Sequence, residues 1–575
     1  MKLNIKFAYA LAYVLQRDYK AVIADIGEVE SNFYIDFDSS KKVSIADFKN
    51  IEKAAFNFLY DKKNQLVIKN KKTSDVAKCS CLKKNKYLAY WIKQVSTKTV
   101  KMAKVNDDFA FINKLEDTKN LNFNEVKSFK LLNMAGNYWL SNAKNKQLQR
   151  ITGYAFSSKD ELKAYEAELK DRSERDHRKL GAELELFTFD DLAGQGHPIW
   201  LPNGTAVMNV IDDTVREYLV KNGFKFVSTP VLGSVELYKT SGHWFHYREN
   251  MYNPLKIDKE QMVLRPMTCP HHMLVYKSKP RSYRELPFVV AEKAILHRYE
   301  ASGALIGLER VRNMQLIDTH KIIRPDQIET EIRHYYRVIM EVLKAFNIKI
   351  HRIDLSLHDP KDKEKYFDNP AMWKKAEKEL QAVMDDMGMK YEKKVGEAAF
   401  YGPKIDMQMK TALGHIITMS TIQLDFLLPE RFKLEYINAQ GKKERPILVH
   451  GGIIGTLERF MSILLESTKG VFPLWLAPVQ VQLIPVVDKH IKYCKELEQK
   501  LLNANIRVAV DNSDERLGKK IRNAQIKKIP YQLVIGDEEI KSGNISYREY
   551  GKQDVTTLSL DKFIKLIQQK NAARK

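Results

Sequence analysis

The chain has 575 residues, with 95 Lys and Arg against 72 Asp and Glu, so its net charge is +23 at pH 7. Hydrophobic residues make up 44% of it and aromatic residues 10%, which excludes a disordered chain and is typical of several folded domains. No apolar run is long enough to cross a bilayer, so we expect no membrane partner.

Residues 1–157 are lysine-rich and predict an N-terminal α+β domain that begins with a helix. The opening run MKLNIKFAYALAYVLQRDYK resembles a signal peptide, but no small-residue cleavage site follows it. Short apolar runs at 33–37 and 87–92 predict strands. Residues 158–184 are highly charged and predict a linker helix, with Ser158 as N-cap and Glu161 completing a capping box.

Residues 185–472 predict one large domain with an antiparallel sheet and helices, because apolar strand-like segments recur there between loops. Residues 473–575 change to a strand–helix–strand–helix pattern. That pattern predicts a small α/β domain with a mostly parallel sheet. The predicted fold class is therefore α+β with several domains.

Charge and cysteine usage narrow the possible partners and location. A surplus of positive charge this large indicates a polyanion such as a nucleic acid. Lysine-rich drift of an ordinary surface would give the same charge, so charge alone does not separate the two. Cys79, Cys81, Cys269 and Cys494 are scattered and suggest no disulfide framework, which indicates a reducing, cytoplasmic location.

Two segments of the large domain carry charges that suit a polyphosphate. In LHRYEASGALIGLERVRNMQLIDTH (296–320), alternation would place Arg298 and Glu300 on one face of a first strand. A second strand would gather six residues on one face: Arg310, Arg312, Met314, Leu316, Asp318 and His320. Guanidinium groups arranged in this way grip phosphate oxygens, although an exposed salt-bridged hairpin would explain the same pattern.

The segment HGGIIGTLERFMSILLES (450–467) runs from a strand end through glycines into an apolar helix that carries Arg459. Glycines let the backbone approach a ligand closely. A single arginine in such a helix is more often at the surface than at a ligand. The two segments together favour a binding site.

These motifs resemble class II aminoacyl-tRNA synthetases, and within them the threonyl-tRNA synthetase family. The resemblance extends from about residue 150 to 575 and includes LYKTSGHWFHYRENMY, LRPMTCP, HRYEASGALIGLERVR, AFYGPKID, STIQLDF, GTLERF and PLWLAPVQV. Pro230 fits the first class II motif, at the family's dimer interface, Arg298 the second and Arg459 the third. The resemblance implies a homodimeric ligase: threonine attacks the α-phosphate of ATP, and the 3′ end of tRNA(Thr) takes the threonyl group from the adenylate.

The resemblance also implies roles for single residues. Arg298 would stabilise the charge on the α-phosphate, Arg310 and Arg459 would pin the γ-phosphate, and Glu300 would contact adenine, with Mg²⁺ screening the phosphates. The residues implied for ATP are Arg298, Glu300, Arg310, Lys404, Gln423 and Arg459, of which Arg298 and Arg459 would be catalytic. Those implied for threonine are Met267, Asp318, Tyr401 and Gln423, with Asp318 receiving the ammonium group.

In this family one Zn²⁺ per subunit is held by one Cys and two His, which match Cys269, His320 and His450. These are separated by 51 and 130 residues, so no short-range zinc spacing reveals them. His271 and His272 are local alternatives, but a ligand so soon after Cys269 and a proline would need an awkward turn. Three protein ligands leave open positions for the amino nitrogen and hydroxyl of threonine. Such a site would reject valine and admit serine appreciably.

The sequence departs from the family at four positions of the large domain. Leu316 stands where glutamine is usual, His271 replaces glycine, Phe245 replaces aspartate and Gly451 replaces arginine. None of these changes removes an implied metal ligand or phosphate arginine. They could weaken the affinity for threonine or its adenylate.

The N-terminal domain departs further. Relatives often begin with a ubiquitin-like domain, which we do not expect here. They then carry an editing domain that hydrolyses seryl-tRNA with an HxxxH helix and a later Cys and His. Residues 27–38 and 129–156 resemble its frame, but the first histidine of this chain is His177, and Cys79 and Cys81 lie in a lysine-rich loop. We predict a folded editing domain without hydrolytic activity.

At the other end of the chain, Glu539 and Arg548 match positions that read anticodon bases. Lys519 and Lys520 suit phosphates, and ordinary surface charge explains each of these four residues equally well.

Two other functions compete with the ligase. A synthetase-like regulatory RNA-binding protein is disfavoured by the intact phosphate arginines and zinc set. A synthetase for serine or proline is disfavoured by the zinc set.

Overall fold

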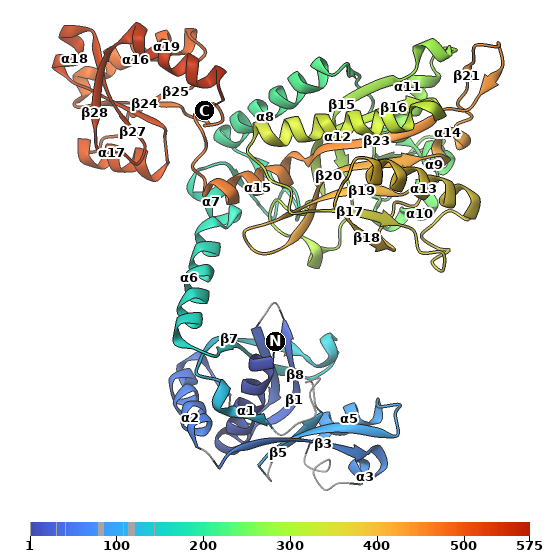
Figure 1. Cartoon of the computed structure of the whole chain (residues 1–575). Coiled ribbons are helices and arrows are strands. Elements are labelled where there is room, and N and C mark those ends of the chain that lie inside the picture. The colour runs from blue at the N-terminus through green and yellow to red at the C-terminus, as the bar shows by residue number, and fades with distance from the viewer. Residues whose placement is uncertain are drawn as a thin grey trace. The chain divides into compact units, whose positions relative to one another are not determined.

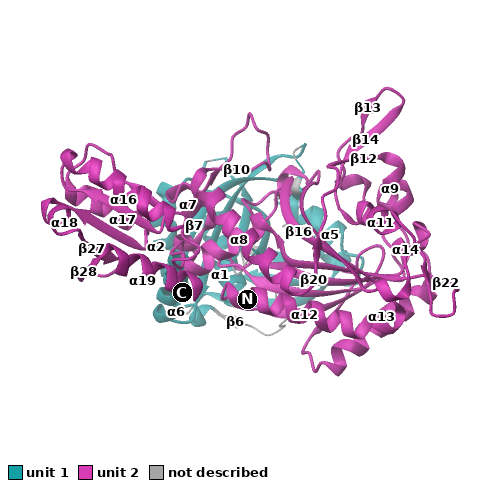
Figure 2. Ribbon diagram, turned by 90° about the horizontal axis from the view of Figure 1, so that it is seen from above, with its two compact units in different colours: residues 1–171 teal, residues 172–575 magenta. Residues whose placement is uncertain are grey.

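The computed structural model describes residues 2–574 except 30–31, 41, 62, 79–84, 107–108, 113–120 and 143. Cys79 and Cys81 therefore lie outside the described residues. The chain divides into two compact units, Met1–Asp171 and Arg172–Lys575 (Figures 1 and 2). No helix among the described residues is long and apolar enough to cross a membrane.

The first unit contains two four-stranded sheets, with strand orders β1-β2-β8-β7 and β5-β4-β3-β6. The strands are β1 Val22–Val29, β2 Asn32–Asp38, β3 Gln65–Lys72, β4 Thr99–Val105, β5 Phe109–Ile112, β6 Leu121–Asn122, β7 Ser128–Tyr138 and β8 Gln147–Phe156. The helices are α1 Lys2–Tyr19, α2 Phe48–Tyr60, α3 Thr73–Ala77 and α5 Lys86–Lys93.

Helix α1 is the N-terminal helix that the sequence predicts, and its middle is buried on every side. Each side chain from Asn4 to Ala12 is buried, as expected for a helix that is apolar around its whole circumference. Two polar side chains within it have partners. Asn4 Nδ2 donates to Glu28 Oε1 at 2.8 Å, and Lys6 Nζ donates to Glu125 Oε2 at 2.6 Å.

One predicted strand of this unit is wrong and one is confirmed. Residues 87–92 belong to the helix α5 because Asn85 caps it: Asn85 Oδ1 accepts from the backbone N–H of Tyr87 and of Leu88, both at 3.0 Å. Apolar side chains then face the core at helical spacing. Residues 33–37 lie in the strand β2, as predicted.

The charged linker forms two helices where one was expected, α6 Lys159–Arg175 and α7 His177–Glu183. Ser158 caps α6, because its Oγ accepts from Glu161 N at 3.1 Å, but Glu161 Oε2 bonds Ser157 N instead of completing the box with Ser158. The break falls at Asp176, whose carboxylate accepts from Arg178 N at 2.9 Å and so begins α7. The division between the two units falls inside α6.

The second unit is built on an eight-stranded sheet of order β11-β15-β16-β23-β20-β19-β17-β18. Its neighbours are antiparallel except for parallel pairs at both edges, β11 with β15 and β17 with β18, so the predicted antiparallel core is confirmed. The strands are β11 Lys225–Phe226, β15 Phe288–His297, β16 Asn313–Ile323, β17 Arg352–Leu357, β18 Glu392–Val395, β19 Lys404–Lys410, β20 Ile416–Asp425 and β23 Ile447–Thr456.

Helices and short strand pairs surround this sheet. The helices are α8 Pro202–Lys221, α9 Val235–Ser241, α10 His243–His246, α11 Cys269–Lys277, α12 Ile328–Ala345, α13 Pro370–Asp386, α14 Leu427–Arg431 and α15 Leu457–Thr468. The short strands are β9 Phe187–Thr188, β10 Ile199–Trp200, β12 Leu232–Ser234, β13 Leu255–Ile257, β14 Glu260–Leu264, β21 Tyr436–Ile437 and β22 Lys443–Glu444.

Helix α12 lies along β23 and β20 on one face of the large sheet (Figure 1), and its Tyr335 accounts for the glycine at position 451. A Cβ at position 451 would lie 2.2 Å from Cε1 of the Tyr335 ring. Glycine at 451 therefore makes room for this aromatic ring, which occupies space that a longer side chain would need. The opposite face of the sheet carries the candidate site.

The C-terminal part of the second unit is the predicted α/β domain, with a sheet of order β25-β24-β26-β27-β28. Two of its pairings are parallel, and the hairpin strands β27 and β28 add two antiparallel ones. The sheet is therefore mixed, and the prediction of a mostly parallel sheet is wrong. The strands are β24 Val481–Pro485, β25 Val508–Val510, β26 Tyr531–Ile535, β27 Asn544–Glu549 and β28 Val555–Ser559. The helices are α16 Ile491–Asn503, α17 Leu517–Ile526, α18 Asp537–Ser542 and α19 Leu560–Ala572.

Candidate active site and metal centre

A pocket of about 390 Å³ opens on the face of the large sheet that α12 leaves free. It brings together residues from distant parts of the sequence, including most of those predicted for the site. The predicted residues that line it are Met267, Cys269, Arg298, Asp318, His320, Tyr401, Lys404, Gln423, His450 and Arg459. Glu300 and Arg310 are not among the lining residues.

The strand register explains why residues so far apart in sequence meet. His320 on β16 pairs directly with His450 on β23, His450 pairs with Gln423 on β20, and Gln423 pairs with Lys404 on β19. Directly opposed residues project to the same face with Cβ atoms about 4.5–5.5 Å apart. Four side chains from four strands therefore form one row across the floor of the pocket.

The remaining member of the predicted metal set comes from a helix above the strands. Cys269 is the first residue of α11, and Pro270 at the next position suits the first turn of a helix. The preceding residue, Thr268, donates its hydroxyl hydrogen bond to Asp318 Oδ2 on β16. This contact ties the start of α11 to the strand that carries His320.

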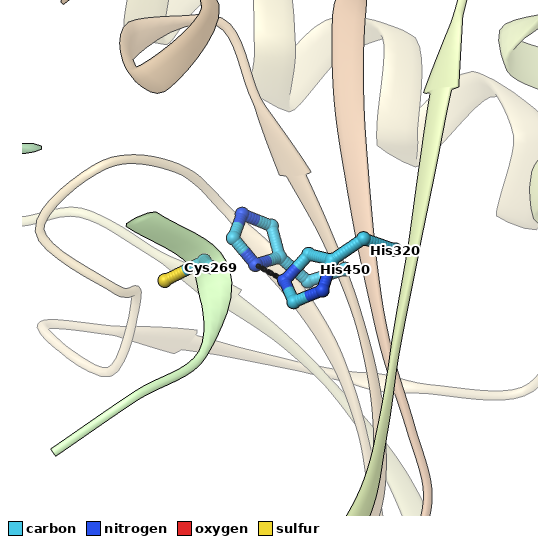
Figure 3. A group of neighbouring side chains, drawn as sticks. All are labelled: Cys269, His320 and His450. Atoms are coloured by element: carbon cyan, nitrogen blue, oxygen red, sulfur yellow. Dashed lines mark hydrogen bonds between the residues drawn. The ribbon is translucent and has the colours of Figure 1, made fainter. Parts of the chain in front are cut away.

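Cys269, His320 and His450 form a group that could hold a metal ion (Figure 3). The distance between His320 Nε2 and His450 Nδ1 is 2.9 Å, and one ligand atom from each of the three residues lies within 4.8 Å of the others. All three are buried. One sulfur and two imidazole nitrogens are a donor set that zinc accepts, and three protein ligands would leave coordination positions open.

The electrostatics of the group also suit a cation. Burial, together with the nearby carboxylates of Asp318 and Asp425, raises the pKa of the Cys269 thiol well above its usual value. Burial lowers the pKa of His320 well below its usual value, as do His450 and His272. A neutral imidazole can ligate a metal directly, and a divalent ion compensates the charge of a buried thiolate.

The two histidines that follow Cys269 closely in sequence, His271 and His272, make other contacts. His272 Nδ1 is 2.7 Å from His320 Nδ1, the nitrogen of that ring that faces away from His450. His271 packs edge-on against the Tyr238 ring, with a centroid distance of 6.4 Å, and burial lowers its pKa to about 4. Neither belongs to the group of three that could share an ion.

Two of the arginines predicted to bind phosphate, Arg298 and Arg459, line the pocket. Arg459 lies in the first turn of α15, where Thr456 Oγ1 accepts from its backbone N–H at 3.2 Å. Its guanidinium is held by two carbonyls, Nε to Glu309 O at 3.1 Å and Nη1 to Thr418 O at 3.0 Å. Burial lowers the pKa of Arg459, and the positive charges of Arg298 and Arg310 lower it further. Such a cluster of cations suits a polyanion.

Arg298 and Glu300 lie just beyond the strand on which the sequence placed them, and Arg310 and Arg312 lie before the next one. Strand β15 ends at His297 and β16 begins at Asn313, because the backbone turns where Glu300 N donates to Arg298 O at 2.9 Å. Glu300 and Arg310 form an ion pair at 2.9 Å. The residues predicted for adenine and for the γ-phosphate are therefore bonded to each other in this structure.

The predicted amino-acid pocket is closely packed around His450. The Tyr401 ring stacks on the His450 ring with centroids 4.7 Å apart, and its hydroxyl donates to Gln423 Oε1 at 2.5 Å. Lys404 forms an ion pair with Asp406 at 2.9 Å. Leu316, at the position where glutamine is usual, lines the same pocket.

His243 is a neighbour of the metal group that the sequence patterns did not single out. Its Nε2 lies 3.1 Å from Met267 Sδ and 3.6 Å from Cys269 Sγ, and its Nδ1 lies 2.8 Å from Ser241 Oγ. Burial lowers the pKa of His243 to about 3. The motif SGHWFHY contained it, but nothing in the local pattern separates this histidine from His246.

A second buried group, His177, Glu309 and Glu466, has suitable residue types for a metal but unsuitable hydrogen bonds. His177 Nε2 accepts from Leu308 N at 3.1 Å. The ring proton is therefore on Nδ1, which donates to Glu466 Oε1 at 2.8 Å. Both ring nitrogens are engaged, so the group joins α7, the loop before Arg310 and α15 as a structural junction.

The predicted anticodon residues lie on neighbouring elements of the C-terminal domain. Glu539 on α18 accepts from Gly536 N at 3.0 Å and from Ser546 Oγ at 2.9 Å. Ser546 and Arg548 are two residues apart on β27 and share a face. Glu539 and Arg548 can therefore serve the same surface of the sheet.

Comparisons with known proteins agree with this architecture. The family model "tRNA synthetase class II core domain (G, H, P, S and T)" matches residues 252–468, and the model "Anticodon binding domain" matches residues 480–570. The first contains the pocket from Met267 to Arg459. The second covers most of the C-terminal α/β domain.

Similarity to individual proteins extends along the whole chain. It is 48% identical over 589 aligned residues to a threonine–tRNA ligase of Ureaplasma parvum serovar 3, covering 100% of this chain and 99% of the relative. It is 46% identical to a threonine–tRNA ligase of Staphylococcus aureus, covering 97% of this chain and 86% of the relative. A solved structure titled as the RNA binding domain of threonyl-tRNA synthetase from Cryptosporidium parvum Iowa II matches 68% of this chain and 98% of its own, with 36% identity and a TM-score of 0.65.

Proposed function

Because the chain belongs to the threonine–tRNA ligase family of class II aminoacyl-tRNA synthetases, we propose that it joins L-threonine to tRNA(Thr) at the expense of ATP. Pyrophosphate leaves ATP as threonyl-adenylate forms, and AMP leaves when the 3′ end of the tRNA takes the threonyl group. The full-length similarity to threonine–tRNA ligases carries the proposal. The domain matched by the anticodon-binding model supports tRNA as the partner.

We assign the phosphate side of the pocket to ATP with its Mg²⁺. Arg298 stabilises the charge that spreads over the α-phosphate in the transition state, and Arg459 holds the γ-phosphate. Arg310 assists Arg459, which requires its ion pair with Glu300 to open so that Glu300 can meet the adenine amino group. Lys404 and Gln423 complete this side. The chemistry needs positioning and charge stabilisation more than proton transfer.

We assign Cys269, His320 and His450 to one zinc ion per subunit, supported by their donor types, burial and spacing. When bound, the ion supplies coordination positions for the amino nitrogen and the hydroxyl of threonine. Asp318, held by Thr268, receives the ammonium group. Met267, Tyr401 and Gln423 enclose the side chain.

This assignment predicts the selectivity of the site. Valine has the shape of threonine without its hydroxyl, and a site built to bind a hydroxyl rejects such an isostere by about 10⁴-fold or more. Serine keeps both donor groups and lacks one methyl, which is worth only about 1–3 kcal/mol. Discrimination against serine by the pocket is therefore weak.

We propose that the first unit no longer hydrolyses seryl-tRNA. The chain has no histidine before His177, and the middle of α1 is a packed core in which Lys6 is paired with Glu125. Purified protein given serine, ATP and tRNA(Thr) should accumulate seryl-tRNA. Rapid clearing of preformed seryl-tRNA(Thr) by the same protein would contradict the loss of editing.

Further parts of the proposal concern organisation. We divide the chain into an editing-like domain at 1–157, a linker at 158–184, a class II catalytic domain at 185–472 and an anticodon-binding domain at 473–575. Glu539 and Arg548 read the anticodon. Two copies form a homodimer through the region of Pro230, and the protein works in the cytoplasm.

The function is tested by ATP–pyrophosphate exchange with each standard amino acid, followed by charging of tRNA(Thr). Threonine should give the fastest exchange, serine a slower one and valine almost none. A regulatory RNA-binding protein would give no exchange with any amino acid. Fastest exchange with serine or proline would instead identify a synthetase for that amino acid.

A further inference from the structure

His272 connects the metal group to a buried carboxylate. It lies in α11, three residues after Cys269, and is fully buried. Its Nδ1 is 2.7 Å from His320 Nδ1, and its Nε2 is 3.0 Å from Glu292 Oε2. Glu292 lies on β15 opposite Asp318. A continuous chain of contacts therefore runs from Glu292 through His272 to His320.

Glu292 is held as an anion. Burial raises its pKa, but hydrogen bonds from His272 and Thr229 and the charge of Arg265 outweigh burial and lower the pKa to about 2. Arg265 Nη1 donates to Oε1 at 2.9 Å, and Thr229 donates through its N–H at 3.0 Å and its hydroxyl at 2.7 Å. An ionised carboxylate can only accept hydrogen bonds. His272 Nε2 must therefore carry a hydrogen and donate it.

Because His272 donates to Glu292, the hydrogen bond between His272 and His320 also has a fixed direction. With its hydrogen on Nε2, His272 can accept through Nδ1 from His320 Nδ1–H. His320 then has its lone pair on Nε2, the atom that faces His450. The tautomer of His320 is thus set by a carboxylate two side chains away.

His450 is constrained in the same way from its other side. Asp425 Oδ1 accepts the backbone N–H of Leu427 and of Leu428, and its Oδ2 lies 3.0 Å from His450 Nε2. His450 therefore donates through Nε2 and has its lone pair on Nδ1. Two lone pairs, on His320 Nε2 and His450 Nδ1, face each other across 2.9 Å. They repel unless a cation lies between them.

We propose that His272 and Glu292 are positioning residues that fix the tautomer and ring orientation of His320, so that its Nε2 faces the metal before the metal arrives. This inference rests on the zinc site of the proposed function. The group of His177, Glu309 and Glu466 differs in this respect. The backbone N–H of Leu308 donates to the lone pair of His177, so this ring has no nitrogen free for a metal. Outer partners of this kind change metal affinity by about 10–100-fold when they are removed.

The sharpest test compares two variants of nearly equal shape. In His272→Asn the side-chain oxygen lies close to the position of the original Nδ1 and can still accept from His320. His272→Leu has a similar volume and no acceptor. Zinc affinity is measured on the purified full-length proteins by competition with a chromophoric chelator, and folding is checked by thermal unfolding and by AMP binding.

We expect His272→Leu to bind zinc about 10–100-fold more weakly than the wild type, and His272→Asn to recover most of that loss. Equal zinc affinity in wild type and His272→Leu would overturn the inference. So would equal weakening in both variants, since that would show a packing role. A wild type without zinc would instead overturn the zinc assignment itself, so the two failures are distinguishable.

A second variant, Glu292→Gln, tests the same inference if His272→Leu does not fold. Glu292→Gln keeps the size of the side chain but removes the anion that makes His272 donate through Nε2. We expect it to weaken zinc binding in the same direction while threonine-independent binding of AMP stays unchanged. A folded Glu292→Gln protein with wild-type zinc affinity would also overturn the inference.

Discussion

Cys269 shows how burial makes a single side chain depend on a partner. Burial raises the pKa of its thiol, so the thiolate form needs a cation beside it. We expect Cys269→Ala to lose zinc and threonine activation together. Elemental analysis of the purified protein and ATP–pyrophosphate exchange measure the two losses, and zinc retained at wild-type stoichiometry would contradict the ligand assignment.

Two variants act as controls for this prediction. Cys494 is also a buried thiol whose pKa burial raises, to about 11, but it lies on α16 in the C-terminal domain. Cys494→Ala should keep its zinc. Arg298→Ala should also keep zinc while losing adenylate formation, because it removes a charge from the phosphate side alone. Normal threonine activation by Arg298→Ala would refute its assigned role.

Glu458 gives a prediction about pH at the scale of one residue. It is buried beside Arg459, its two oxygens lie 3.0 and 3.1 Å from Gln315 N, and burial raises its pKa to about 8. Because the pKa is higher in the folded state than in the unfolded state, folding takes up a proton between these values. The stabilising contribution is therefore present at low pH and is lost as pH rises toward 8.

Glu458→Gln removes this dependence. The free energy of unfolding of the wild type, relative to Glu458→Gln, should fall between pH 5 and pH 8 by up to about 1.4 kcal/mol per pH unit. Denaturant unfolding of both proteins at several pH values measures the difference. A difference that is constant with pH would show that Glu458 is ionised in the folded protein.

At the scale of elements, the loop that carries Arg310 is anchored from α7. His177 accepts from Leu308 N, and Arg459 donates to Glu309 O, so the loop is held between two helices. Gly307 makes this approach possible, because its φ is +43° and a Cβ there would lie 2.3 Å from His177 Nε2. An alanine at this position is strained and pushes the loop away from His177.

We expect Gly307→Ala to raise the KM for ATP several-fold and to destabilise the protein by about 1–3 kcal/mol. Gly303→Ala is a matched control in the same loop, since a Cβ at 303 meets no atom within 4 Å. ATP–pyrophosphate exchange over a range of ATP concentrations separates the two variants. Similar behaviour of both would show that the junction does not position the loop.

At the scale of the whole molecule, positive charge is unevenly distributed. Residues 62–106 contain thirteen lysines and one acidic residue, Asp75. Lys69, Lys71 and Lys72 on β3 and Lys101 on β4 are exposed. A basic surface of this kind binds RNA phosphates and releases counterions, which makes affinity fall steeply with salt.

We expect the KM for tRNA to rise steeply with KCl, while threonine activation without tRNA stays nearly constant. A combined variant, Lys69→Ala, Lys71→Ala and Lys72→Ala, should raise the KM for tRNA at low salt. It should also reduce the slope of log KM against log salt by about one for each of these lysines that binds a phosphate. An unchanged slope would exclude these lysines from the tRNA interface.

Local sequence patterns predicted most of the helices and strands. They failed where a single capping side chain decided whether a segment is a strand or a helix, or where a helix ends. The N-terminal helix, the strands of the large sheet and the C-terminal α/β domain follow from hydrophobic periodicity, which acts over a few residues. The run 87–92 has the composition of a strand, yet Asn85 caps it as a helix. The linker helix is broken at Asp176, whose carboxylate caps a new helix.

The site could be anticipated in part. The motifs around Arg298 and Arg459 suggested phosphate binding, and the family resemblance supplied roles that stay predictions for each residue. The ion pair between Glu300 and Arg310, the position of His243 beside Cys269 and the contact of His272 with His320 had no signal in the sequence. Each joins residues whose separation along the chain does not determine their distance in space.

The motifs were enough to predict the family, and the residue order alone shows that no histidine precedes His177. Tertiary structure alone decided which side chains share the pocket: His320, His450, Gln423 and Lys404 meet because four strands pair in one register. It also decided which nitrogen of each histidine is free, through Glu292 and Asp425. The physical reason is that periodicity and capping act between near neighbours in the chain, whereas strand register and buried hydrogen bonds join residues that are far apart along it.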